Sequence, residues 1–193
     1  MIADQPHLPL QSAVASLAHC VARTFALLAR REIAQPAGHL GDVLRFGDGS
    51  RGRVYRETVA VHAATDEPVV LVVAFRLRWV RGFGHALFRA ESLLNTPLFV
   101  GFPGFVSKLW LAHDERAVYR GVYQWNGRER ADAYVRALWW VLALVSVRGS
   151  IHYVVLPGLR RDDMLADPRR LDDAAPGDAE AWWRLVGVER GSP

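Results

Sequence analysis

The stretch PGFVSKLWLAHDERAVYRGVYQW, residues 103–125, predicts two β-strands joined by a polar turn. Its two apolar halves, 105–111 and 117–125, are rich in the aromatic and β-branched residues that favour strands. Between them, HDER at 113–116 is short and charged, as is typical of a hairpin connection. The stretch therefore predicts an antiparallel hairpin at the centre of the fold.

The segments on either side of this hairpin alternate between strand and helix patterns. A strand over 69–79 and a helix over 84–95 are predicted before it, and a helix over 126–145 and a strand over 151–156 after it. The order β-α-β-β-α-β is that of a ferredoxin-like unit. We therefore expect an α+β domain over 68–158.

Two further segments flank this domain. Residues 1–67 predict an N-terminal extension, and 159–193 predict a polar tail with a short helix around 179–186. The extension is expected to contain one helix and a β-hairpin, at 12–33, 42–46 and 53–62.

Both long helices carry apolar residues that predict their packing. In the N-terminal helix, spacings of three, four and seven define one face that we expect to be buried. The residues of this face are Val14, Leu17, Ala18, Val21, Phe25 and Leu28. The helix over 126–145 is apolar on a second side through Trp139, Trp140 and Leu144, which predicts a cover there, either the N-terminal helix or a partner subunit.

Composition is that of a globular protein and narrows the classes of function. Of 193 residues, 51% are hydrophobic and 23% charged, enough for a sizeable core. The net charge is +4, but the arginines are scattered, so nucleic-acid binding is not expected. Cys20 is the only cysteine and the seven histidines lack ligand spacing, so we expect neither a disulfide nor a metal site.

No targeting or nucleotide-binding motif is expected either. There is no basic region before an apolar N-terminal run and no uninterrupted apolar run of about 18 residues, so a cytoplasmic protein without a membrane partner is expected. GDGSRG at 47–52 matches GxGxxG, but a strand rather than a helix is predicted after it, so we interpret it as a hairpin turn.

The central strands carry cationic and aromatic residues whose shared faces depend on the hairpin register. With a three-residue turn, Lys108 and Trp110 share a face with two polar residues; with a two- or four-residue turn they share it with two tyrosines. The two polar residues are Arg120 and Gln124, and the two tyrosines are Tyr119 and Tyr123. A cation among aromatic rings in a dry pocket would hold a flat anionic or phenolic molecule, although cations that are solvated or paired across an interface explain the pattern equally well.

Residues 69–158 resemble the dimeric α/β-barrel superfamily, which includes antibiotic-biosynthesis mono-oxygenases and haem-degrading enzymes. The resemblance is to mono-oxygenase-like proteins of the YdhR type, with a PGF-x-x-K-x-W strand followed by a G-x-Y strand. The matching residues are Pro103, Gly104, Phe105, Lys108, Trp110, Gly121 and Tyr123.

The resemblance implies a homodimer whose two sheets combine into a barrel, with a small-molecule pocket between each sheet and its own helices. Enzymatic members of the mono-oxygenase branch oxidise aromatic polyketides without metal or flavin, so no cofactor is expected. Such a site must stabilise an anion, relay a proton and exclude water, because a phenol reacts with oxygen as its phenolate. A haem site would need a histidine on or near the second helix, and 128–145 contains none.

These requirements identify candidate residues. The catalytic candidates are Lys108, His152 and Tyr123, and His152 lies inside the apolar strand IHYVV, which is expected to be buried. The substrate-binding candidates are Arg76, Trp110, Tyr119 and His85, with Arg78 as a second cation beside Arg76. The leading hypothesis is a small-molecule enzyme of secondary metabolism, a cofactor-independent mono-oxygenase or a cyclase/isomerase acting on an aromatic or polyketide-like substrate. The alternative is a non-catalytic homodimer that binds a ligand or stabilises an assembly.

Overall fold

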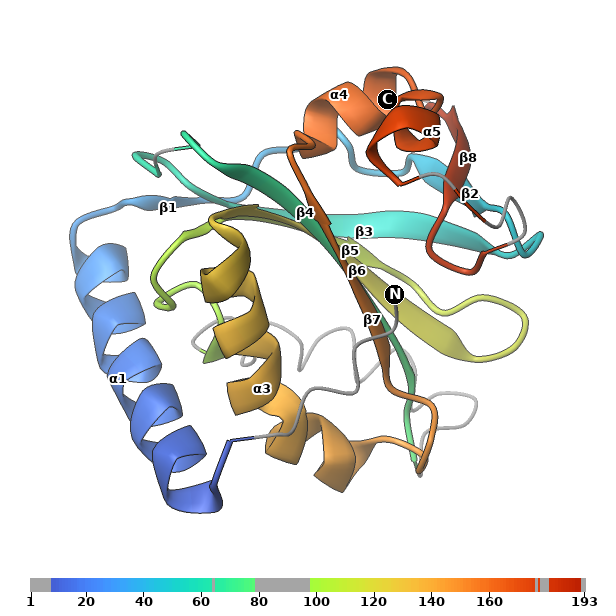
Figure 1. Ribbon diagram of the computed structural model, residues 1–193. Helices are drawn as coiled ribbons and strands as arrows, with labels where there is room; N and C mark the ends of the chain where they lie inside the picture. Colours follow the sequence, from blue (N-terminus) through green and yellow to red (C-terminus); the bar gives the residue numbers. More distant parts are fainter. Residues whose placement is uncertain (1–7, 64, 79–97, 176, 178–180, 192–193) are drawn as a thin grey trace.

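The computed structural model describes residues 8–63, 65–78, 98–175, 177 and 181–191, which form one sheet with helices on both sides (Figure 1). The helices are α1 (Leu10–Ala29), α3 (Arg128–Val145), α4 (Arg161–Ala166) and α5 (Arg170–Ala174). The strands are β1 (Ile33–Ala34), β2 (Val43–Phe46), β3 (Arg51–Ala60), β4 (Pro68–Arg76), β5 (Phe105–Leu111), β6 (Val118–Asn126), β7 (His152–Pro157) and β8 (Leu185–Glu189).

The four strands predicted around the central hairpin are adjacent, in the order β7-β4-β6-β5, and every pairing among them is antiparallel. The mixed helix and antiparallel sheet agrees with the predicted α+β class. The helix predicted over 84–95 lies outside the described residues. β4 is apolar up to Arg76, its exposed last residue, because both its faces are covered: Leu71 and Val73 belong to one core cluster, and Val70 and Val72 to the other. We call the face packed against α1 and α3 the near face, and the opposite one the far face.

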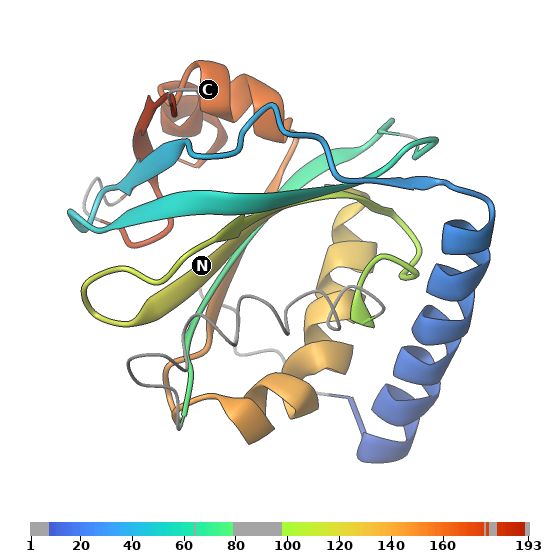
Figure 2. The same cartoon turned by 180° about the vertical axis from the view of Figure 1, so that it is seen from behind.

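The predicted N-terminal hairpin is confirmed and extends this sheet. β3 pairs with β5 on one side and with β2 on the other, so the hairpin continues the sheet beyond the central strands (Figure 2). GDGSRG is its turn, as interpreted: Phe46 N donates to Ser50 O at 3.0 Å, and Gly49 has a φ of 77° that glycine adopts without strain.

The N-terminal helix, one of the two predicted alternatives, packs against α3 but covers its second side only in part, because Leu144 is 75% exposed (Figure 1). Trp140 Nε1 on α3 donates to Leu8 O at 2.8 Å. The predicted buried face of α1 is wrong in part, since Val14 and Phe25 are 56% and 60% exposed.

The residues that α1 buries are small, namely Ala13, Cys20 and Thr24. The backbone of α1 lies very close to the segment before β5 at Gly101. A Cβ added at Gly101 would lie 2.0 Å from the carbonyl oxygen of Cys20, so a glycine is needed there. Contact with the backbone of the neighbouring segment therefore sets the orientation of α1, rather than the bulk of its apolar stripe.

Among the described helices, α1 is long and apolar enough to cross a membrane by length and composition, with a mean hydropathy of 1.4 over its best window. This helix is not an uninterrupted apolar run, since Ser16, His19 and Arg23 lie within it. In the structure α1 packs against α3, and no membrane is needed to account for that contact.

The C-terminal segment is a packed layer on the far face rather than a polar tail. The short helix predicted around 179–186 is wrong where the structure describes it, because Leu185 begins β8, which pairs with β2. The contact between this segment and the sheet is made by a few apolar residues on short helices and a short strand. These residues are Met164, Leu165, Leu171 and Leu185. The homodimer stays a prediction, but a second sheet could reach this face only by displacing the segment.

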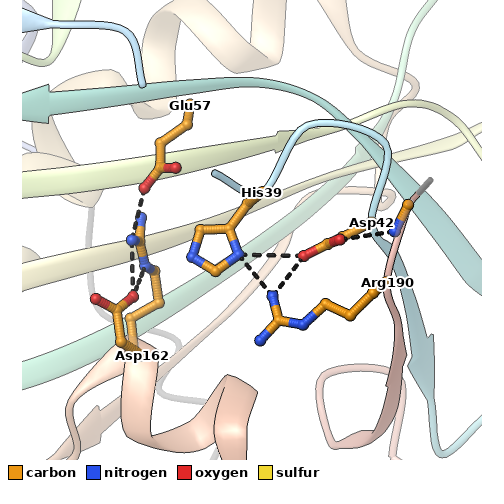
Figure 3. Close-up of polar contacts among 7 residues, drawn as sticks. His39, Asp42, Glu57, Asp162 and Arg190 are labelled. Carbon is orange, nitrogen blue, oxygen red and sulfur yellow. Dashed lines mark hydrogen bonds and ion pairs between the residues drawn. The ribbon is translucent and has the colours of Figure 1, made fainter. Parts of the chain in front are cut away.

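Two polar clusters, each with a buried carboxylate from the sheet side, fasten this segment to the sheet (Figure 3). Arg161 Nη2 donates to Glu57 Oε1 at 2.6 Å, and both residues are buried. Asp42 accepts from Arg190 Nη1 at 2.7 Å and from Gly191 N at 2.9 Å. Burial alone raises the pKa of Asp42, but its hydrogen bonds outweigh burial and leave the pKa below the ordinary value.

Candidate functional site

A cavity of about 440 Å³ lies between the near face of the sheet and α3. Most of its described lining is aliphatic or aromatic and comes from β3, β4, β5, β6 and α3. Three cationic residues, Lys108, Arg78 and Arg120, and no acidic residue belong to the described lining. An apolar space with few polar groups is typical of a small-molecule site.

The hairpin register decides which strand residues reach this cavity. Lys108 pairs with Tyr123, and Trp110 pairs with Gly121. Lys108 and Trp110 therefore share the near face with the tyrosines, which is the second of the two predicted alternatives. Arg120 directs its guanidinium elsewhere, with Nη1 donating to Asp114 Oδ2 at 2.8 Å.

The amine of Lys108 lies in an aromatic cage. Its Nζ is 3.1 Å from the ring centroid of Trp110, 4.5 Å from that of Phe99 and 4.7 Å from that of Tyr123. The residue is only 7% exposed. In the part of the chain that the structure describes, every ion pair takes its cation from an arginine or from His39, so none involves Lys108.

Two opposing effects set the charge of this amine. Each cation–π contact favours the ammonium by about 0.5–2 kcal/mol, whereas burying a charge without a counter-ion costs several kcal/mol. Burial, and secondarily the nearby Arg56 cation, lower the pKa of Lys108 well below its ordinary range. Burial thus acts against the cation–π contacts and shifts Lys108 toward the free amine, which can accept a proton.

Two buried tyrosines provide hydroxyl groups in the same cavity. Tyr123 Oη and Tyr134 Oη are 3.2 Å apart, within hydrogen-bond distance. Burial raises the pKa of both phenols, so they stay protonated and serve as donors rather than as bases. Because one hydrogen serves their mutual bond, the pair retains a second hydrogen to offer a ligand.

The indole of Trp110 is held in place from β3. Its Nε1 donates to Thr58 Oγ1 at 3.1 Å, and both residues are buried. This bond orients the ring that lies nearest to the Lys108 amine.

Gly121 makes room for the cage, since an added Cβ would lie 2.7 Å from Tyr123 Cε2 and 3.2 Å from Lys108 Cε. We expect Gly121→Ala to destabilise the fold by about 1–3 kcal/mol, the usual cost of overpacking a core, and to weaken binding in the cavity. Urea unfolding and titration with an apolar fluorescent probe measure the two effects. Gly38→Ala is the matched control, because nothing lies within 4 Å of its added Cβ. Equal behaviour of the two variants would contradict the prediction.

Most of the predicted site residues are brought together here. Lys108, Trp110, Tyr119 and Tyr123 all line the cavity. Arg78 lines it as well, although its Nε donates to Ser146 O at 3.2 Å.

Arg76 and His152 are not part of this group. His152 pairs with Ala74, so both side chains project to the far face with Arg76, two residues further along β4. The buried position predicted for His152 is wrong, because its side chain is exposed at the edge of the sheet. His85 lies outside the described residues.

Three cavity residues were missed from the sequence, namely Tyr55, Phe99 and Tyr134. They come from the N-terminal hairpin, from the segment before β5 and from α3. Only Tyr134 carried a signal, because it lies on the apolar stripe of the predicted helix.

Comparison with known proteins adds one finding. No family model and no curated protein matches the chain. The structure is similar to that of an uncharacterized ferredoxin-fold protein related to antibiotic biosynthesis monooxygenases, from Listeria monocytogenes. The TM-score is 0.41 at 14% identity, and the match covers 55% of this chain and 63% of that protein. The neighbour has a ferredoxin fold.

The described residues contain no group of three or more His, Cys, Asp and Glu side chains that could hold a metal ion. The cavity residues supply an amine, guanidinium groups, phenol hydroxyls and aromatic rings.

Proposed function

We propose that the protein is a small-molecule enzyme whose cavity removes a proton from a flat, largely apolar substrate, with Lys108 as the base. The supporting observation is the buried amine of Lys108, caged by Phe99, Trp110 and Tyr123 and without an ion pair in the described part of the chain. A free amine among aromatic rings suits a phenolic or similarly acidic aromatic substrate.

The first step transfers the proton of the substrate hydroxyl to Lys108 Nζ. The products are an ammonium and a phenolate, whose mutual attraction is strong in a water-poor cavity. The hydroxyl pair of Tyr123 and Tyr134 donates its spare hydrogen to the anion, and Trp110 packs against the ring. The site thus forms a charge pair from two neutral groups and avoids the binding of a preformed anion.

Two classes of reaction can follow from a phenolate or its carbanion form. With dioxygen as the oxidant, oxidation of a ring methylene to a carbonyl consumes one dioxygen and releases one water, and the substrate supplies all the electrons. Without oxygen, the same carbanion closes a ring or shifts a double bond, as a cyclase or isomerase requires. Both need the proton removal assigned to Lys108.

Binding of 4-nitrophenol tests the proton transfer directly, because its phenolate is yellow and its neutral form is nearly colourless. At a pH about one unit below the pKa of the free phenol, the wild-type protein is expected to produce the phenolate spectrum. Lys108→Met keeps the volume of the side chain and removes the amine, so it should bind the phenol without the yellow band.

Binding of the phenol without ionisation by the wild-type protein would refute the role of Lys108 and favour a protein that only binds its ligand. Oxygen consumption with phenolic substrates then separates the two reaction classes. An oxidase reaction depletes dissolved oxygen, whereas a cyclase or isomerase leaves it unchanged.

A further inference from the structure

A second pocket, of about 350 Å³, lies on the far face, where the chain turns between β4, β7 and the C-terminal segment. Arg76 and His152, which the register removes from the cavity, both line it. The remaining cations in its described lining are Arg116, Arg120 and Arg148, and that lining contains no acidic residue. The pocket is therefore cationic, in contrast to the apolar cavity on the near face.

The charges at this pocket do not cancel. Arg120 pairs with Asp114 at 2.8 Å, and Arg116 shares Asp48 with it at 3.5 Å. Arg76 and Arg148 are exposed and take part in no ion pair in the described part of the chain. Four guanidinium groups thus face two carboxylates, which leaves two positive charges for a ligand.

Some exposed arginines in the described chain have a carboxylate partner, and others, such as Arg30 and Arg31, have no ion pair there. Arg169, for example, pairs with Asp167 at 2.9 Å and Arg128 with Asp132 at 3.7 Å. A surface arginine can therefore find a carboxylate in this protein, whereas Arg76 and Arg148 face a hollow without one.

The pocket also has a fixed frame. Ser150 Oγ accepts from Arg76 N at 3.1 Å and donates to Val147 O at 2.7 Å, which ties β4 to the turn that carries Arg148. Trp182, from the C-terminal segment, adds a half-buried aromatic wall, and its ring lies 6.0 Å from that of His152.

We propose that this pocket binds a small-molecule phosphate monoester, with the phosphate at Arg76 and Arg148 and the flat body of the ligand against Trp182. Guanidinium groups bind phosphate oxygens in a bidentate geometry, and a dianion matches the two positive charges left at the pocket. Arg76, Arg148 and Trp182 do not line the Lys108 cavity, so this site does not depend on the proposed enzymatic function.

Calorimetric titration with phenyl phosphate and with inorganic phosphate tests the site. The wild-type protein should bind phenyl phosphate saturably, and added salt should weaken the binding. Arg76→Gln combined with Arg148→Gln should raise the Kd at least tenfold. Trp182→Leu should weaken phenyl phosphate more than inorganic phosphate, because only the former has a ring to place on the indole.

The matched control is Arg30→Gln combined with Arg31→Gln, which removes the same charge from exposed positions after α1. This control and Lys108→Met should leave the Kd unchanged, and far-ultraviolet circular dichroism checks that each variant is folded. The proposal is overturned if the wild-type protein shows no saturable binding, or if the control loses as much affinity as the Arg76 and Arg148 variant.

Discussion

Lys108→Met is expected to be more stable than the wild-type protein while losing the ability to ionise a bound phenol. Lys108 keeps its amine in an aromatic cage with a pKa well below the ordinary range, so folding at neutral pH works against its charge. Methionine fills a similar volume without a polar group, and removing a desolvated polar group contributes about 1–3 kcal/mol. Urea unfolding at neutral pH measures the gain as a higher midpoint with an unchanged slope.

The pH dependence of this difference in stability tests the lowered pKa of Lys108 independently. The folded-state pKa of Lys108 is lowered, so between that value and the unfolded pKa of about 10.4 the unfolded chain binds more protons. Wild-type stability should therefore rise with pH across this window relative to Lys108→Met. The pH-dependent part of the difference between the two proteins is expected to be largest at low pH and to vanish near the unfolded pKa. A difference that stayed constant with pH would show that the amine is charged in the folded protein.

Glu57→Ala is expected to destabilise the protein by about 3–5 kcal/mol, the usual result of removing one partner of a buried ion pair. Arg161 is 4% exposed, and its remaining carboxylate, Asp162, has a side chain that is 72% exposed. The loss also loosens α4 from the sheet, because Arg161 begins that helix. Chemical denaturation measures the free energy, and hydrogen exchange locates the loosened segment.

The matched control is Asp167→Ala, which breaks the exposed pair with Arg169 and should destabilise the protein far less, because solvent screens an exposed pair. Glu57→Leu combined with Arg161→Met should recover much of the loss, since no unpaired charge then remains buried. If Glu57→Ala were no worse than Asp167→Ala, the Glu57–Arg161 pair would not be what holds the far-face layer.

The cavity was only partly predictable. The sequence placed Lys108 two residues before Trp110, so their common face followed from the alternation of a strand. Whether Tyr123 lies on the same face depends on the hairpin register. A slip of one residue replaces the tyrosines on that face by Arg120 and Gln124. His152 illustrates the limit, because an apolar neighbourhood predicted burial, while the position of β7 at the edge of the sheet left its side chain exposed.

The sequence by itself determined the central hairpin, the strands beside it, the helix after it and the single amine at Lys108, because these depend on local periodicity and composition. The tertiary structure decided the direction in which each polar side chain points and what covers each face. The far-face layer of α4, α5 and β8 shows why: its buried apolar residues are too widely spaced for a periodic signal. The layer is held on the sheet by contacts between residues that are far apart in the sequence. Arg161 and Glu57, for example, form a buried ion pair across 104 positions.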